Sequence, residues 1–266
     1  GGSGHLNAVT VRENMGKSWR FNGEYAWSHT EEPDTNWVTS TATFGKYTAA
    51  TDGESFGGYA FSQSLQRTKR NWGTEFNWNH ASQTFRADMG FVPINNRHDF
   101  GGGQRYIGRP NGKLLKFYQV FIGGNGNITP QGLWKNQTLN TEYNFQFAKN
   151  FALGGGVMHG FMEEFEGVVL RDMTRAWNWI SWSPDQAVRL NIYVNPGEFV
   201  AYNTGVPRIG QGLNSGITAN FQIAGKLQAN FNGNYSSLYE ETGGEKIYSG
   251  WIWRSVVRYN MNRFVQ

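Results

Sequence analysis

The strongest constraint on the fold is an alternation of apolar and polar residues between Gly212 and Leu238. Side chains of a β-strand point to opposite sides in turn, so the alternation predicts strands with one apolar and one polar face. Ala224, Gly225 and Lys226 interrupt it and predict a hairpin turn. Each arm has about ten residues, enough for a tilted strand to cross a bilayer core. The apolar series is Ile217, Ala219, Phe221, Ile223, then Leu227, Ala229, Phe231, Tyr235; the polar series is Thr218, Asn220, Gln222, then Gln228, Asn230, Asn232, Asn234.

The composition argues against a helical membrane protein and fits a membrane β-barrel. Hydrophobic residues make up 38% of the 266 residues and the mean hydropathy is -0.57. The chain has no run of about 18 apolar residues, which excludes a helical membrane protein. Aromatic residues make up 16%, with 35 glycines and 11 tryptophans, as expected for a barrel wall with aromatic girdles. The alternative on composition alone is a soluble all-β protein with an aromatic core.

The same alternation recurs along most of the chain and predicts about fifteen strands. Three further segments are interpreted as loops: the one from Gly123-Gly124 to Trp134, Glu163–Arg171 and Pro196–Gln211. The expected strands outside the first hairpin are Leu6–Arg12, Lys17–Ser28, Trp37–Tyr47, Glu54–Gln66, Asn71–His80, Phe85–Phe91, Arg97–Ile107, Lys113–Gly123, Gln137–Phe147, Phe151–Met162, Met173–Trp182, Val188–Asn195 and Tyr248–Tyr259.

The expected connections fall into two classes. Those near Asn14, Thr51, Ser82, Asn111, Lys149, Pro184, Gly225 and Asn262 are mostly short, and those near Glu32, Thr68, Ile94, Asn127, Glu164, Gly205 and Glu241 are more variable. Outer-membrane barrels have short periplasmic turns and long extracellular loops. The sequence therefore predicts an all-β fold, a transmembrane antiparallel up-and-down β-barrel, with residues 1–266 as part of one such domain. An odd strand count predicts further sequence at both ends and about sixteen or more strands in total.

Charged residues on the polar rows are the candidate functional residues. A charge on the lipid face costs about 2–4 kcal/mol at the bilayer midplane, so these side chains are expected to face the lumen. They either line a channel that selects polar solutes or form a cross-strand lattice of salt bridges that stiffens the wall. Arginine outnumbers carboxylate, five to four, which predicts weak anion preference. The predicted lumen-lining residues are Arg20, Glu24, Glu75, Arg86, Asp88, Glu142, Arg189, Arg254 and Arg258.

Signatures of other function classes are weak. The chain has no cysteine, and its net charge of +4 is spread along the sequence, which gives no support to nucleic-acid binding. No GxSxG, HExxH or Walker motif is present, and the histidines lack metal-ligand spacing. We therefore expect no catalytic residue, no metal and no cofactor. Trp37, Trp134 and Trp251 are interpreted as girdle residues, with stacking on sugar rings as the alternative.

One short motif resembles a known family. The segment FRADMGFVP, Phe85–Pro93, followed by Arg97 and Asp99, resembles a bacterial outer-membrane barrel family of unassigned function that usually lies C-terminal to a family-9-like carbohydrate-binding domain. The hairpin spacing is similar over nearly the whole chain. Ile94 stands where that family has an arginine after the proline, and Arg97 is the candidate substitute. The resemblance implies polar or glycan-related ligands.

These observations lead to one expected function and one alternative. We expect a channel or uptake component for polar, including glycan-related, solutes in the bacterial outer membrane. Its expected partners are the lipid bilayer, lipopolysaccharide and other proteins of an outer-membrane complex, with no nucleic acid. The alternative is a closed barrel that anchors a soluble domain or partner protein without transport, in which Asn125–Asn136 or Pro196–Gln211 folds inward.

Overall fold

The structure is a computed structural model that describes residues 2–35, 37–86, 95–110, 112–202, 205–223, 226–240 and 244–259. The chain forms two compact units, Gly1–Gln104 with Gly124–Gln137, and Arg105–Gly123 with Thr138–Gln266. Within the described ranges, no helix has the length and apolar character needed to cross a membrane.

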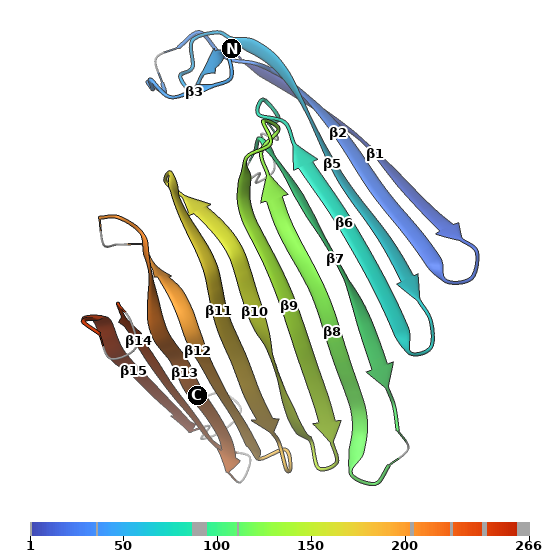
Figure 1. The fold of residues 1–266 in the computed structure, drawn as a ribbon, viewed down its shortest axis with the longest axis vertical. Helices are drawn as coiled ribbons and strands as arrows, with labels where there is room; N and C mark the ends of the chain where they lie inside the picture. Colours follow the sequence, from blue (N-terminus) through green and yellow to red (C-terminus); the bar gives the residue numbers. More distant parts are fainter. Residues whose placement is uncertain are drawn as a thin grey trace. The chain divides into compact units, whose positions relative to one another are not determined.

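Thirteen strands of the described residues form one antiparallel sheet with up-and-down connectivity, and a separate small sheet pairs β3 with β4 (Figure 1). The large sheet has the order β1-β2-β5-β6-β7-β8-β9-β10-β11-β12-β13-β14-β15, so each strand lies beside its neighbour along the chain once β3 and β4 are set aside. The strands are β1 Ser3–Met15, β2 Trp19–Glu31, β3 Thr43–Phe44, β4 Tyr47–Thr48, β5 Ser55–Thr68, β6 Trp72–Ala81, β7 Arg97–Gly108, β8 Leu115–Ile128, β9 Trp134–Phe147, β10 Phe151–Phe165, β11 Val168–Trp182, β12 Val188–Ala201, β13 Arg208–Ile223, β14 Leu227–Tyr239 and β15 Lys246–Tyr259.

The register of the first unit separates polar from apolar rows. Glu24, Ser62 and Asn79 lie side by side on β2, β5 and β6, and this side is the polar face. Tyr25 and Phe61 pair on the opposite side, the apolar face. Because strand side chains alternate, one correct pairing fixes the face of every residue along these strands.

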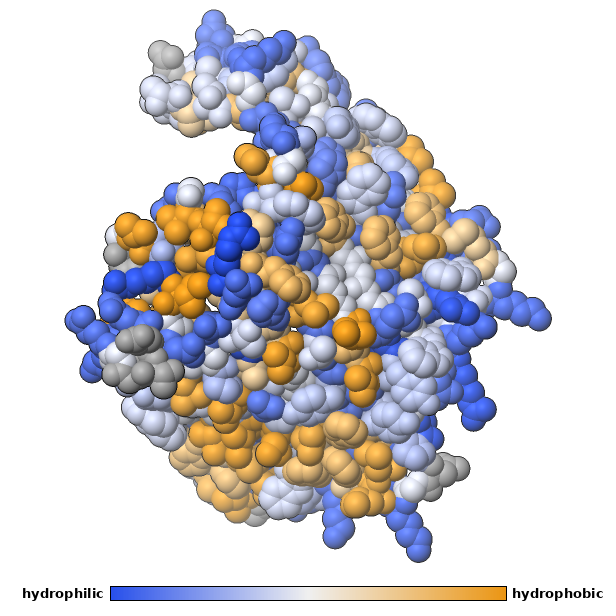
Figure 2. All heavy atoms as spheres, in the orientation of Figure 1, coloured by the Kyte–Doolittle hydropathy of each residue, from blue (hydrophilic) through white to orange (hydrophobic). Residues whose placement is uncertain are grey.

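The second unit has the same division. Leu190, Ala219 and Phe231 are direct neighbours on its apolar face. One residue along, Thr218 and Asn232 are neighbours on its polar face. Figure 2 shows apolar residues gathered over the ends of β8 to β11 that lie lowest in Figure 1. The predicted alternation of the hairpin between Gly212 and Leu238 is therefore confirmed.

Three loop predictions are wrong because the strands are longer than expected. Strand β8 runs through Gly123 and Gly124 to Ile128, and Trp134 begins β9. The predicted loop Glu163–Arg171 is instead a turn at Glu166 and Gly167 between β10 and β11. Most of Pro196–Gln211 belongs to β12 and β13. Since β-strands lengthen into both predicted extracellular segments, neither Asn125–Asn136 nor Pro196–Gln211 is a long loop.

One strand prediction is also wrong, and a second can be scored only at its first two residues. Trp37–Tyr47 is mostly irregular and contributes only β3 and the start of β4, outside the large sheet. Phe85 and Arg86 belong to the connection between β6 and β7, and residues 87–94 lie outside the described residues. Thr51 and Ser82 consequently lie in the two long connections of the first unit, while Thr68 ends β5 before a short turn.

These two long connections pack together on the polar face of the first unit. The rings of Phe44 and Tyr47 lie 5.3 and 5.1 Å from that of Phe56, which is 2% exposed. Gly58 allows the close approach of residue 85, because a Cβ at Gly58 would lie 2.3 Å from backbone atoms of Phe85. A small aromatic core therefore covers this end of β2 and β5.

Candidate solute-binding face

The candidate site is a hollow of about 810 Å³ on the polar face of the second unit. Three of the predicted lumen-lining residues meet here, Arg189 from β12 and Arg254 and Arg258 from β15. Amide side chains fill the strands between them, among them Asn220, Asn230 and Asn232. The hollow thus combines guanidinium groups with amides on one surface.

The sheet register brings these residues together. Arg189 pairs with Asn220, and Asn220 pairs with Asn230. One row further, Asn232 pairs with Arg254. Residues that are distant in sequence therefore form two adjacent cross-strand rows, because each strand repeats the same polar period of two.

Hydrogen bonds hold the amides in place. The side-chain amide of Asn230 donates to Asn220 Oδ1, and the hydroxyl of Thr218 donates to Asn232 Oδ1 at 3.2 Å. At the rim, Asp185 Oδ1 accepts the backbone N–H groups of Ala187 and Val188 at 2.8 and 3.0 Å. The one carboxylate among the residues lining the hollow is thus engaged by its own turn.

The three arginines have no carboxylate partner in the part of the chain that the structure describes. Among the described residues, Arg189, Arg254 and Arg258 form no ion pair with a carboxylate, and all three are exposed. Guanidinium groups bind carboxylates and phosphates through charge-assisted hydrogen bonds. The arrangement can therefore hold an anionic or hydroxyl-rich solute.

A second, smaller hollow of about 500 Å³ lies on the polar face of the first unit. Arg20 and Glu24, two of the predicted lumen-lining residues, line this hollow. Arg20 donates its Nε–H to Asn14 Oδ1 at 3.3 Å. Glu75 lies in the same cross-strand row as Arg20, with Gln66 between them. The contact of Arg20 is a hydrogen bond to a neighbouring strand, and the choice between a channel lining and a salt-bridge lattice stays a prediction.

The remaining predicted residues have different positions. Glu142 lies on β9, on the side opposite Tyr143, and Asp88 lies outside the described residues. Arg86 is a correction, because it is on no strand: its Nη1 lies 2.8 Å from Glu32 Oε1, and its guanidinium lies 4.7 Å from the Phe56 ring centroid. The local alternation around Arg86 is typical of a strand, but Arg86 itself packs against the Phe56 ring and Glu32.

Sequence reasoning missed two groups of residues. The first is Trp179, which shares a cross-strand row with Tyr193 on the polar face of the second unit. A Cβ at Gly154 would lie 2.5 Å from the Trp179 ring. The signal in the sequence was the glycine triplet 154–156, which begins opposite Trp179. The second group is Glu32, Asp52 and Glu54, whose carboxylates come together in the first unit. Both ends of the connection between β2 and β5 are acidic, which was the available signal.

The described strands and their two faces define an antiparallel, all-β sheet protein with up-and-down connectivity. A family model described as "Domain of unknown function (DUF5916)" matches residues 7–250, and the chain belongs to this family. No curated protein and no solved structure matches the chain.

Proposed function

We propose that the chain is part of the wall of a transmembrane β-barrel in the bacterial outer membrane and acts as a channel or uptake component for polar solutes. The observation that carries this proposal is the separation of faces. Asn191, Thr218, Asn232 and Arg254 form an unbroken polar row across β12 to β15, and Leu190, Ala219 and Phe231 form an apolar row one residue away. A polar row suits a water-filled lumen and an apolar row suits lipid.

Strand length supports the same proposal. Strand β10 has 15 residues and β13 has 16. A tilted strand needs about 9–11 residues to cross the hydrocarbon core, whereas strands of soluble proteins have about 5–6. The apolar face would contact lipid and lipopolysaccharide, and the polar rows would contact solute. The proposal assigns no catalytic step to the chain.

The arginine hollow favours anionic or hydroxyl-rich solutes, and the resemblance to a glycan-associated barrel family adds glycan fragments to that class. Conductance of the intact protein in a planar bilayer tests the proposal. We expect discrete channel openings that occur only in bilayers containing the protein. Absence of openings from protein that is folded and inserted would contradict transport.

One observation favours the alternative of a closed barrel that anchors a soluble domain or a partner protein of an outer-membrane complex. The aromatic core of Phe44, Tyr47 and Phe56 covers part of the polar face of β2 and β5. In a barrel, this packing would narrow the lumen at one end. Deletion of residues 37–50 distinguishes the two functions, because conductance that appears only after the deletion supports the anchoring barrel.

A further inference from the structure

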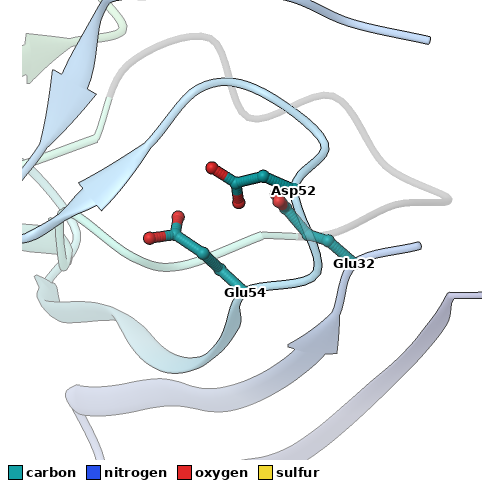
Figure 3. Close-up of side chains that lie close together, drawn as sticks. All are labelled: Glu32, Asp52 and Glu54. Carbon is teal, nitrogen blue, oxygen red and sulfur yellow. The ribbon is translucent and has the colours of Figure 1, made fainter. Parts of the chain in front are cut away.

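Three carboxylates come together in the first unit, outside the candidate solute-binding face. Glu32 follows β2 directly, and Asp52 and Glu54 precede β5. One oxygen of each lies within 4.8 Å of the others. Figure 3 shows the three side chains gathered in one place from both ends of the same connection.

Glu32 gives this cluster its unusual chemistry. Its side chain is 2% exposed, and Oε1 accepts the Arg86 guanidinium at 2.8 Å. Oε2 is buried and has no hydrogen-bond partner among the residues that the structure describes. A buried carboxylate oxygen without a donor is costly, so proteins pair such an atom or place it on a metal ion.

The other two carboxylates are held in position by Thr48. Its hydroxyl lies 2.8 Å from Asp52 Oδ2, and its backbone N–H donates to Glu54 Oε2 at 2.7 Å. Among the described residues, neither Asp52 nor Glu54 forms an ion pair with a cationic side chain. Among the described residues, Arg86 is therefore the one cationic side chain that forms an ion pair with any of the three carboxylates.

We propose that Glu32, Asp52 and Glu54 bind a calcium ion. Calcium takes oxygen ligands at about 2.3–2.6 Å, so two oxygens on one ion are separated by at most about 5 Å, and it tolerates irregular geometry. The three oxygens satisfy this limit. The ion joins the two ends of the connection between β2 and β5 and neutralises the buried Glu32 oxygen. It thereby fixes the connection on the polar face beside Phe56.

Calorimetric titration of the intact, chelator-stripped protein with CaCl₂ tests the proposal. We expect one site with a Kd between about 10⁻⁷ and 10⁻³ M, the range of calcium sensors and extracellular modules. Asp52→Asn should weaken binding at least tenfold, and this exposed position leaves the pair of Arg86 and Glu32 intact. The matched control is Glu31→Gln, which removes an exposed carboxylate beside the cluster and should leave the Kd unchanged. No binding by the wild type, or equal weakening by both variants, would overturn the site.

Terbium luminescence provides a second readout that does not rely on the heat of binding. Tyr47 precedes Thr48 and can sensitise a lanthanide bound at the cluster. We expect emission on excitation of tyrosine, loss of emission on adding calcium, and at least tenfold weaker displacement by magnesium, which requires regular octahedral geometry. Unchanged emission in Glu54→Gln, or displacement by magnesium at the same concentration as calcium, would overturn the assignment.

Discussion

The hydroxyl of Tyr193 on β12 donates a hydrogen bond of 2.9 Å to Asn234 on β14, across the intervening strand β13. Gly216 lies between the two residues in the same cross-strand row. Because Gly216 has no side chain, the tyrosine ring occupies the space that a Cβ would need. The hydrogen bond between Tyr193 and Asn234 thus links β12 to β14 across β13, and the glycine at position 216 makes room for it.

Gly216→Ala should destabilise the protein. A Cβ at this position would lie 2.5 Å from Tyr193 Cε1 and 2.6 Å from Asn234 Oδ1, so the bridge must open. We expect a loss of about 1–3 kcal/mol in the free energy of unfolding, measured in detergent with urea. Gly250→Ala is the control, because its Cβ would meet no heavy atom within 4 Å. Equal losses in the two variants would contradict the packing argument.

The two faces of the second unit should differ in their access to water. Rings of Phe145, Phe147 and Phe151 are in sequential contact, and Phe151 pairs with Trp182, which pairs with Leu190. Phe145, Leu190 and Phe221 therefore share the apolar face. Single cysteines at Asn144, Asn191 and Asn220 should react with a soluble maleimide in liposomes, while cysteines at the three apolar positions should not. The reverse pattern would place the polar face in lipid and exclude a water-filled lumen.

Arg86→Met should loosen the long connections of the first unit. In the calcium-free protein, the substitution removes the guanidinium from Glu32 and leaves that carboxylate buried without an ion-pair partner among the described residues. Because Arg86 itself is 34% exposed, we expect a cost of about 2 kcal/mol, below the 3–5 kcal/mol of a fully buried pair. Limited proteolysis between residues 32 and 54 should become faster. Arg208→Met, which breaks the exposed pair with Glu240, should cost less than about 1 kcal/mol and leave that cleavage rate unchanged.

Tyr202 should titrate at unusually high pH. Partial desolvation, together with the hydrogen bond that it donates to Glu163 at 2.6 Å, raises the pKa of Tyr202 to about 12. The folded state therefore holds this proton more tightly than the unfolded state, and the associated stability is lost as the pH rises from about 10 through 12. Ultraviolet difference titration should show one late phenolate that is absent in Tyr202→Phe. An unchanged titration curve in the variant would contradict the hydrogen bond.

Much of the sheet was predictable from sequence because alternation is a local signal. Polar and apolar series around Asn220 and Phe221 required no knowledge of distant residues, and the register of β12 to β15 follows from them. Strand ends were less predictable. Pro196 and Gly197 indicated a loop, yet β12 continues through them: a gap in the pairing with β11 between Val194 and Gly197 accommodates the proline.

The candidate site was predictable to the same extent. Arg189, Arg254 and Arg258 were assigned to the polar face by strand period, but their meeting in one hollow depends on the pairing of separate strands. The position of Arg86 could not be predicted, because it depends on Glu32 and on a ring from β5 that are distant in sequence. Alternation around Phe85 indicated a strand, whereas Phe85 and Arg86 lie outside the strands and pack on other elements.

Ion selectivity tests the central claim most directly. Reversal potentials under a salt gradient should show weak anion preference, because three exposed arginines act on ions over a Debye length of about 8 Å at physiological salt. The combined variant Arg189→Gln, Arg254→Gln and Arg258→Gln should shift the reversal potential toward that of a cation-selective pore. Cation preference in the intact protein, or an identical reversal potential in the variant, would contradict the account.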